Sequence, residues 1–96
     1  MIVSFGDRAT DDFYNGRPTR RARRFPPEIH AVALRKLDMV NAARQLEDLR
    51  APPGNRLERL RGKLKGFHGI RVNDQWRVIF RWEGSDAHAV RLTDYH

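Results

Sequence analysis

The strongest constraint on the fold is a change of hydrophobic periodicity at residues 51–54, Ala-Pro-Pro-Gly. Before this break, apolar residues recur every three or four positions, at Ile29, Ala33, Leu37 and Val40. That spacing predicts a helix with one apolar stripe, the form that packs on a sheet. After the break, apolar residues alternate with other residues, at Trp76, Val78, Phe80 and Trp82. Alternation predicts strands with one buried face, so the fold class should be α+β.

The helices should lie in the first half of the chain. Residues 7–14 predict a short helix, because Asp7 or Thr10 can cap its first turn. Pro26 should open the longest helix, since a proline in the first turn loses no helical hydrogen bond. We expect this helix to continue to residues 46–49 and to end at the proline-rich break.

Three segments predict strands. Residues 2–5 should form a first strand that completes the sheet, and residues 70–82 should form a hairpin with a tight turn at Asn73-Asp74. Residues 87–95 should form the third neighbour of that hairpin. The prediction is one domain over residues 1–96, in which two N-terminal helices pack on one face of a small antiparallel sheet.

The charge balance points to an anionic partner. Lysine and arginine number 19 against 12 aspartates and glutamates, so the formal net charge is +7. A charge of this size on so small a chain favours nucleic acid or an acidic protein as partner. Residues 17–24 alone carry five arginines and predict a solvated loop or a frayed helix start. This connector either binds RNA or a partner protein, or is only solvated.

Composition also excludes several classes of site. Without cysteine there can be no disulfide, thiolate metal site or cysteine nucleophile. The four histidines lack close metal-ligand spacing, and no dinucleotide-binding, P-loop or nucleophile-elbow motif is present. We therefore expect no metal and no cofactor. The sequence has neither a long apolar run nor a secretion signal, so we expect a cytoplasmic protein with no membrane partner.

The strands should present a basic face. Burial of the apolar strand residues against the helices puts Arg77 and Arg81 on the opposite, open face, together with Arg71 and Asn73. Eight basic residues compete with two acidic ones in this half: Arg56, Arg59, Arg61, Lys63, Lys65, Arg71, Arg77 and Arg81 against Glu58 and Asp74. Such a face can hold phosphates without reading a base sequence. Alternatively, some of these arginines only cover the sheet edge or pair with nearby carboxylates, at Glu58, Asp74 and Asp94.

The chain ends Asp94-Tyr95-His96, which brings together an acid, a phenol and an imidazole. RNA is cut without a metal when a base removes the 2'-hydroxyl proton, a cation stabilises the phosphorane and an acid protonates the 5'-oxygen. His96 can serve as base or acid, Asp94 or Tyr95 can orient it or share the proton, and Arg77 can hold the negative charge. Strict alternation puts Tyr95 on the face opposite Asp94 and His96, unless the last residues leave the strand.

Three segments together, residues 55–62, 70–82 and 94–96, resemble the HigB branch of the RelE superfamily in order and spacing. The resemblance implies a compact toxin that enters the ribosomal A site and cleaves messenger RNA without a metal. The catalytic residues it implies are Arg77, Asp94, Tyr95 and His96. Combined with the basic face, it gives as expected RNA-binding residues Arg61, Lys63, Lys65, Arg71, Asn73 and Gln75. Two departures from the family pattern are Glu58, where some members have histidine, and residues 62–66.

The resemblance also implies a helix-turn-helix antitoxin of the HigA type as partner. Any contact with operator DNA would come chiefly from that antitoxin, because nothing in this chain reads as a helix-turn-helix. Two other functions use the same surfaces: a noncatalytic module that binds RNA or the ribosome, and a corepressor subunit of an antitoxin–DNA complex.

Overall fold

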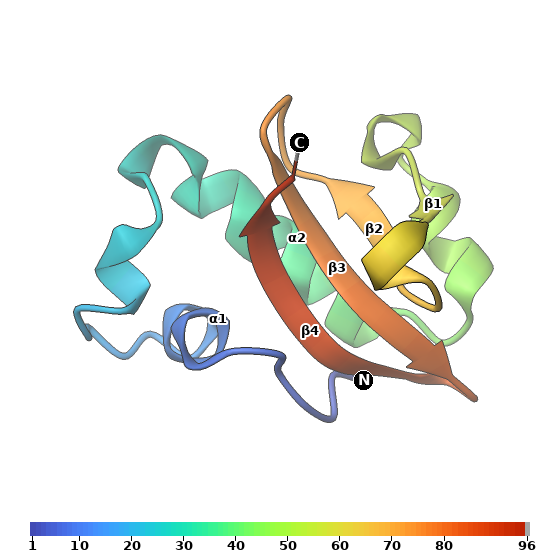
Figure 1. Ribbon diagram of the computed structural model, residues 1–96, viewed down its shortest axis with the longest axis horizontal. Coiled ribbons are helices and arrows are strands. Elements are labelled where there is room, and N and C mark those ends of the chain that lie inside the picture. Colours follow the sequence, from blue (N-terminus) through green and yellow to red (C-terminus); the bar gives the residue numbers. More distant parts are fainter. Residues whose placement is uncertain (96) are drawn as a thin grey trace.

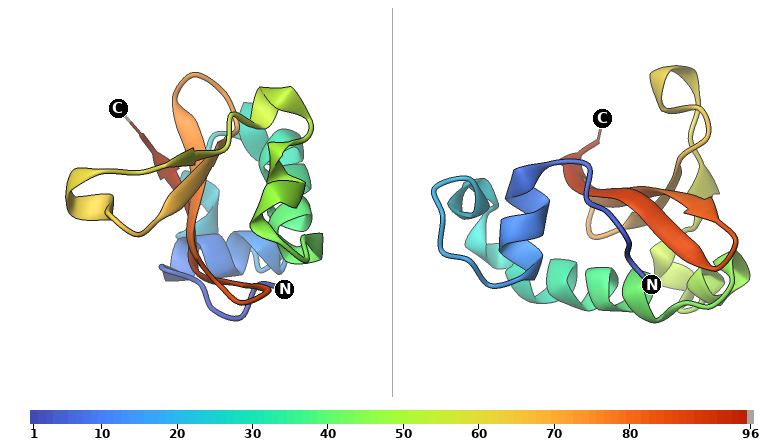
Figure 2. Two further views of the ribbon diagram at one scale, coloured as in Figure 1. Left: turned by 90° about the vertical axis from the view of Figure 1, so that its right-hand side faces the viewer. Right: turned by 90° about the horizontal axis from the view of Figure 1, so that it is seen from below.

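A computed structural model describes residues 1–95. These residues form two α-helices followed by an antiparallel sheet of four strands in the order β1-β2-β3-β4 (Figure 1). The elements are α1 (Arg8–Tyr14), α2 (His30–Ala42), β1 (Glu58–Arg59), β2 (His68–Arg71), β3 (Trp76–Glu83) and β4 (Asp86–Asp94). In Figure 2, α2 lies along one side of the sheet, and the loop between β1 and β2 projects from the sheet. The α+β prediction is confirmed.

Both predicted helices form, but the longer one ends early. Asp7 caps α1, its carboxylate accepting a hydrogen bond from the Thr10 amide at 2.8 Å. The stripe predicted for α2 is buried as a whole: Ile29, Ala33, Leu37 and Val40. The expected continuation to residues 46–49 is wrong, because Ala43 is extended and Leu46–Arg50 forms a separate 3₁₀ helix. The Asp48 carboxylate accepts hydrogen bonds from the backbone amides of Arg44 and Gln45, and it thereby stabilises the start of this 3₁₀ helix.

The sheet keeps the predicted turns. Asn73 Oδ1 accepts from the amides of Gln75 at 2.9 Å and Trp76 at 2.7 Å, which closes the turn between β2 and β3. The turn between β3 and β4 contains Gly84 with φ of 62°, a conformation that glycine adopts without strain. The hairpin and its third strand are therefore confirmed.

Residues 2–5 do not form the regular first strand that their apolar character predicted. They run parallel to β4 and make only isolated bridges, from Ile2 to Ala87 and from Phe5 to Val90. A bulge interrupts β4 between these bridges, where Ala89 has φ of 52°. The bulge breaks the regular alternation of hydrogen bonds, so a continuous ladder cannot form there.

The core lies between the helices and one face of the sheet, where Leu37 and Val40 of α2 pack with Val78 and Phe80 of β3. The opposite face is less open than alternation predicted, because Ile79 is fully buried on it. Leu60 covers this position, and a Cβ placed on Gly69 would lie 3.5 Å from Leu60 Cδ2 and 3.6 Å from Ile79 Cγ2. The face that carries the arginines thus has a small apolar floor.

Candidate active site and nucleic-acid interface

The strand register assembles the candidate site on the sheet face turned away from the helices. Arg77 pairs with Arg71 on β2 and with Thr93 on β4, so these three side chains share one face. Glu58 pairs with Gly69, which pairs with Ile79, and this places Glu58 on the same face. The Glu58 carboxylate therefore lies on the same face as Arg71 and Arg77.

Arg77 lies at the centre of this face and is largely buried, with 20% of its side chain exposed. Its Nε atom is 3.6 Å from Glu58 Oε1, close enough for an ion pair but too long for a hydrogen bond. Nε and Nη1 are buried and have no hydrogen-bond partner among residues 1–95. A buried donor without a partner costs about 1–3 kcal/mol. An anion that reaches these nitrogens would remove that cost.

Tyr95 lies beside Arg77, with the guanidinium carbon 5.6 Å from the ring centroid. The Tyr95 amide donates to the Gln75 carbonyl at 2.8 Å, so pairing with β3 continues to this residue. Asp94 pairs with Trp76 and points to the other side, where its Oδ2 accepts from Gln75 Nε2 at 2.8 Å. Alternation is thus confirmed for Asp94 and Tyr95. His96, the fourth predicted catalytic residue, lies outside the described residues.

The predicted RNA-binding residues near the turn differ in availability. Arg71 forms an ion pair with Asp74, whose carboxylate is almost fully exposed, so a competing phosphate can open this pair at small cost. The side-chain Oδ1 of Asn73 already accepts hydrogen bonds from the two amides of the turn, so this atom serves the structure of the turn. The side-chain Nε2 of Gln75 donates a hydrogen bond to the Asp94 carboxylate.

The other predicted RNA-binding residues lie on the projecting loop. Arg61, Lys63 and Lys65 are exposed around the 3₁₀ helix Gly62–Leu64. At the base of the loop, the Arg81 guanidinium stacks over Phe67, 4.9 Å from its ring centroid. This contact anchors the loop to β3 and keeps its cations on the rim of the sheet.

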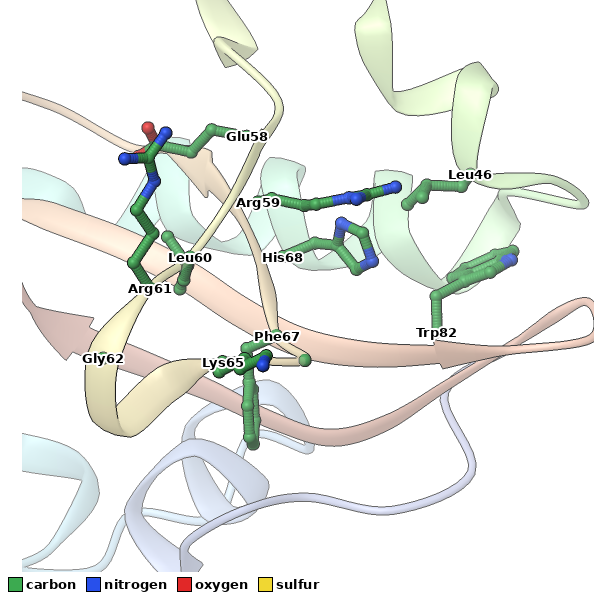
Figure 3. Close-up of a pocket in the computed structure, with 11 residues that line it drawn as sticks. Leu46, Glu58, Arg59, Leu60, Arg61, Gly62, Lys65, Phe67, His68 and Trp82 are labelled. Atoms are coloured by element: carbon green, nitrogen blue, oxygen red, sulfur yellow. The ribbon is translucent and has the colours of Figure 1, made fainter.

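The open edge of β1 borders a pocket of about 1100 Å³ that the sequence did not predict (Figure 3). Its walls include Leu46, Arg59, His68 and Trp82. Burial, followed by the neighbouring Arg59 charge, lowers the pKa of His68. The alternating pattern placed Trp82 on the buried side of β3, but the approach of Leu46 depends on tertiary packing that no local pattern encodes.

The arginine-rich connector is more ordered than a solvated loop. Arg17 and Arg21 form ion pairs with Asp12 of α1, and the Thr19 hydroxyl donates to the same carboxylate at 2.8 Å. This hydrogen bond is the largest cause that lowers the pKa of Asp12. The other three arginines of the connector are exposed: Arg20, Arg23 and Arg24.

Within residues 1–95, no three histidine, aspartate or glutamate side chains are grouped so that they could hold a metal ion. The same part of the chain contains no helix that is long and apolar enough to cross a membrane.

Comparison with known proteins places this architecture in a family. Toxin HigB-1 from Vibrio cholerae is 45% identical over 82 residues, which cover 85% of this chain and 84% of that toxin. An uncharacterized protein from Haemophilus influenzae is 39% identical over 69 residues, 72% of this chain and 68% of its own length.

Two solved structures share the fold. The YoeB-YefM complex from Staphylococcus aureus matches with a TM-score of 0.54 and 13% identity, over 100% of this chain and 98% of that chain. The YoeB/ParE toxin from Agrobacterium tumefaciens matches with a TM-score of 0.53 and 15% identity, over 100% of both chains. The family model for the RelE-like toxin of the type II toxin-antitoxin system HigB matches residues 3–96. The chain therefore belongs to the HigB family of RelE-like toxins.

Proposed function

We propose that this toxin is an endoribonuclease that cleaves messenger RNA in the A site of the small ribosomal subunit and so stops translation. The observation that carries the proposal is the Arg77 guanidinium, whose buried Nε and Nη1 lack hydrogen-bond partners among residues 1–95. A phosphate that displaces the Glu58 carboxylate would supply oxygen acceptors to these donors. The fork of a guanidinium suits phosphate geometry.

The proposed reaction is an internal transfer that needs no metal. The 2'-oxygen attacks the neighbouring phosphorus, a base takes the 2'-hydroxyl proton, and the bond from phosphorus to the 5'-oxygen breaks as an acid protonates that oxygen. The products are a 2',3'-cyclic phosphate and a free 5'-hydroxyl. Arg77 would stabilise the charge that builds on the nonbridging oxygens.

The remaining catalytic roles follow from side-chain chemistry. We propose His96 as a proton donor or acceptor, since imidazole titrates near neutral pH. Tyr95 would keep the guanidinium in place through its ring. Asp94, whose carboxylate accepts a hydrogen bond from Gln75, would orient His96 or share its proton. Which group is base and which is acid is a question for the pH dependence of the cleavage rate.

Messenger RNA and ribosomal RNA would bind the basic rim around this centre. The proposed contacts are Arg61, Lys63, Lys65, Arg71, Asn73 and Gln75. The exposed ion pair of Arg71 with Asp74 can exchange its carboxylate for a phosphate. Affinity should therefore fall steeply as salt rises.

The proposed protein partner is a HigA-like helix-turn-helix antitoxin. A protein with this fold occurs in the YoeB-YefM complex from Staphylococcus aureus, which supports a protein partner for this chain. An acidic segment of an antitoxin would complement the +7 charge of this chain. Operator DNA would then be contacted through the antitoxin.

A substrate modified at one atom tests the chemistry. Ribosomes carrying a messenger with a single 2'-deoxy nucleotide at the cleavage site should bind the toxin but resist cleavage there, and His96→Ala should reduce cleavage of normal messenger by about a hundredfold or more. The upstream product should end in a cyclic phosphate. Cleavage at the 2'-deoxy position would overturn the mechanism, and harmless expression of folded protein in bacteria would favour the corepressor function.

A further inference from the structure

The pocket at the open edge of β1, here called the edge pocket, adjoins the Arg77 centre, because Glu58 lines the pocket and forms the ion pair with Arg77. Leu46 from the segment after α2, Arg59 from β1, His68 from β2 and Trp82 from β3 contribute its walls (Figure 3). Four stretches of chain that are distant in sequence thus converge on one hollow. With a volume of about 1100 Å³, the hollow is large enough for a small organic ring system.

Two aromatic rings of the edge pocket are held in place from below by Phe80. The Trp82 ring packs edge-on against Phe80 with centroids 6.3 Å apart, and the His68 ring is tilted against it at 6.1 Å. Phe80 itself is fully buried. The two rings are not coplanar, since they make angles of 72° (Trp82) and 30° (His68) with Phe80. The Trp82 ring, which rests on a rigid core residue, is therefore the preorganised platform on which a planar ligand can stack.

His68 adds hydrogen-bonding capacity to this platform. Its lowered pKa keeps the imidazole neutral at physiological pH, with one nitrogen as donor and the other as acceptor. Such a group can bind the edge of a nucleobase, which also presents both donors and acceptors. Leu46 adds an apolar side chain to the wall of the pocket.

The charge around the edge pocket selects an anionic ligand. Arg59, Arg61 and Lys65 are exposed among its lining residues, against one carboxylate, that of Glu58. Aromatic rings within a rim of cations are the usual composition of single-strand RNA sites, where bases stack and phosphates are neutralised.

The edge pocket is also continuous with the proposed cleavage centre. Glu58 and Arg59 are consecutive residues of β1, and they face opposite sides of the sheet. Glu58 forms the ion pair with Arg77, whereas Arg59 pairs in register with His68. Among residues 1–95, β1 is the edge of the sheet, so an extended strand of RNA can pass around it.

We propose that the edge pocket is a nucleobase subsite, in which a base of single-stranded RNA stacks on Trp82 and hydrogen-bonds to His68. The proposal rests on the proposed function in that RNA is the ligand, and it adds residues outside the cleavage centre to the binding surface. The base would belong to a nucleotide that flanks the scissile bond.

The test compares two RNA probes in the absence of chemistry. One is an adenine tetranucleotide with 2'-O-methyl groups, which blocks cleavage, and the other is the same backbone without bases. The wild-type protein should bind the base-bearing probe about tenfold more tightly, the scale of stacking one base on an aromatic side chain. Trp82→Leu should reduce this preference below about threefold, whereas Trp82→Phe should keep most of it.

Trp76→Leu is the matched control, because Trp76 is a partly buried tryptophan of the same strand that packs on Phe25 instead. It should leave the preference unchanged. A Trp82→Leu protein that melts normally and still prefers the base-bearing probe would overturn the subsite. If that variant lost its antitoxin while keeping the preference, the edge pocket would be a protein-binding site. Since no probe is cleaved, failure of the nuclease proposal would show in the cleavage assay alone.

Discussion

Arg77 and Tyr95 lie on the same face of the sheet, with the guanidinium of Arg77 5.6 Å from the centroid of the Tyr95 ring. The contact follows from strand pairing. The Tyr95 amide donates a hydrogen bond to the Gln75 carbonyl, and this pairing puts the Tyr95 side chain on the face that carries Arg77. A ring face attracts a guanidinium by about 0.5–2 kcal/mol. Tyr95 therefore helps to fix the group that we propose as the phosphate ligand.

Tyr95 could act through its ring, which contacts Arg77, or through its hydroxyl, and two substitutions distinguish these roles. Tyr95→Phe keeps the ring and should change the single-turnover cleavage rate by less than about threefold, whereas Tyr95→Ala should lower it by about tenfold or more. The rates are to be measured on programmed ribosomes at saturating toxin. A Phe variant as slow as the Ala variant would show that the hydroxyl, rather than the ring, carries the function of Tyr95.

Glu58 should oppose RNA binding, because its carboxylate stands 3.6 Å from the Arg77 nitrogen that a phosphate would occupy. Glu58→Gln removes the charge at nearly constant size and should raise the affinity for uncleavable RNA by about threefold to tenfold. Glu83→Gln, which changes an exposed carboxylate at the far end of β3, is the control. Unchanged affinity in Glu58→Gln would mean that the phosphate does not approach Arg77 from this side.

Alternation along β3 was sufficient to predict that Arg77 and Arg81 share the face opposite Val78 and Phe80. The sequence did not reveal that Ile79 is buried on that same face, because Leu60 covers it from a loop. It also failed at residues 2–5, where a bulge at Ala89 limits the pairing. The local pattern thus predicted the face of each arginine, whereas contacts between distant segments decided the burial of Ile79 and the pairing of residues 2–5.

The edge pocket escaped prediction for the same physical reason. The sequence predicted that Arg61 and Lys65 bind RNA. It could not predict that they line one pocket with Trp82 and Leu46, because this depends on how the segment after α2 packs against the sheet. This segment forms a separate 3₁₀ helix that begins at Leu46, whereas the sequence analysis predicted one continuous helix through this residue. An error about one helix end thus concealed a site.

His68 predicts a loss of stability in mild acid. Its pKa is lowered in the folded protein by burial and by Arg59, so the unfolded chain takes up a proton at a higher pH than the folded one. The free energy of unfolding should therefore fall as pH drops below the ordinary value of 6.5. His68→Gln should lose less stability than wild type between pH 7.5 and pH 5.5 in urea titrations. Equal losses would show that other groups cause the acid sensitivity.

Arg77→Lys tests the proposed centre most directly. A lysine retains the positive charge but presents a single ammonium in place of a planar fork, so it cannot give directed bonds to two phosphate oxygens. We expect the single-turnover rate on programmed ribosomes to fall by at least about tenfold, a rise in the barrier of about 1.4 kcal/mol, with a much smaller change in ribosome affinity. The same change at Arg35, an exposed position of α2, should have no effect on the rate.

The competing structural role is that Arg77 only holds Glu58 and Tyr95 together on the sheet. In that case the melting temperature and the rate would decline together, whereas an Arg77→Lys protein with normal stability and a normal rate would remove Arg77 from the catalytic mechanism.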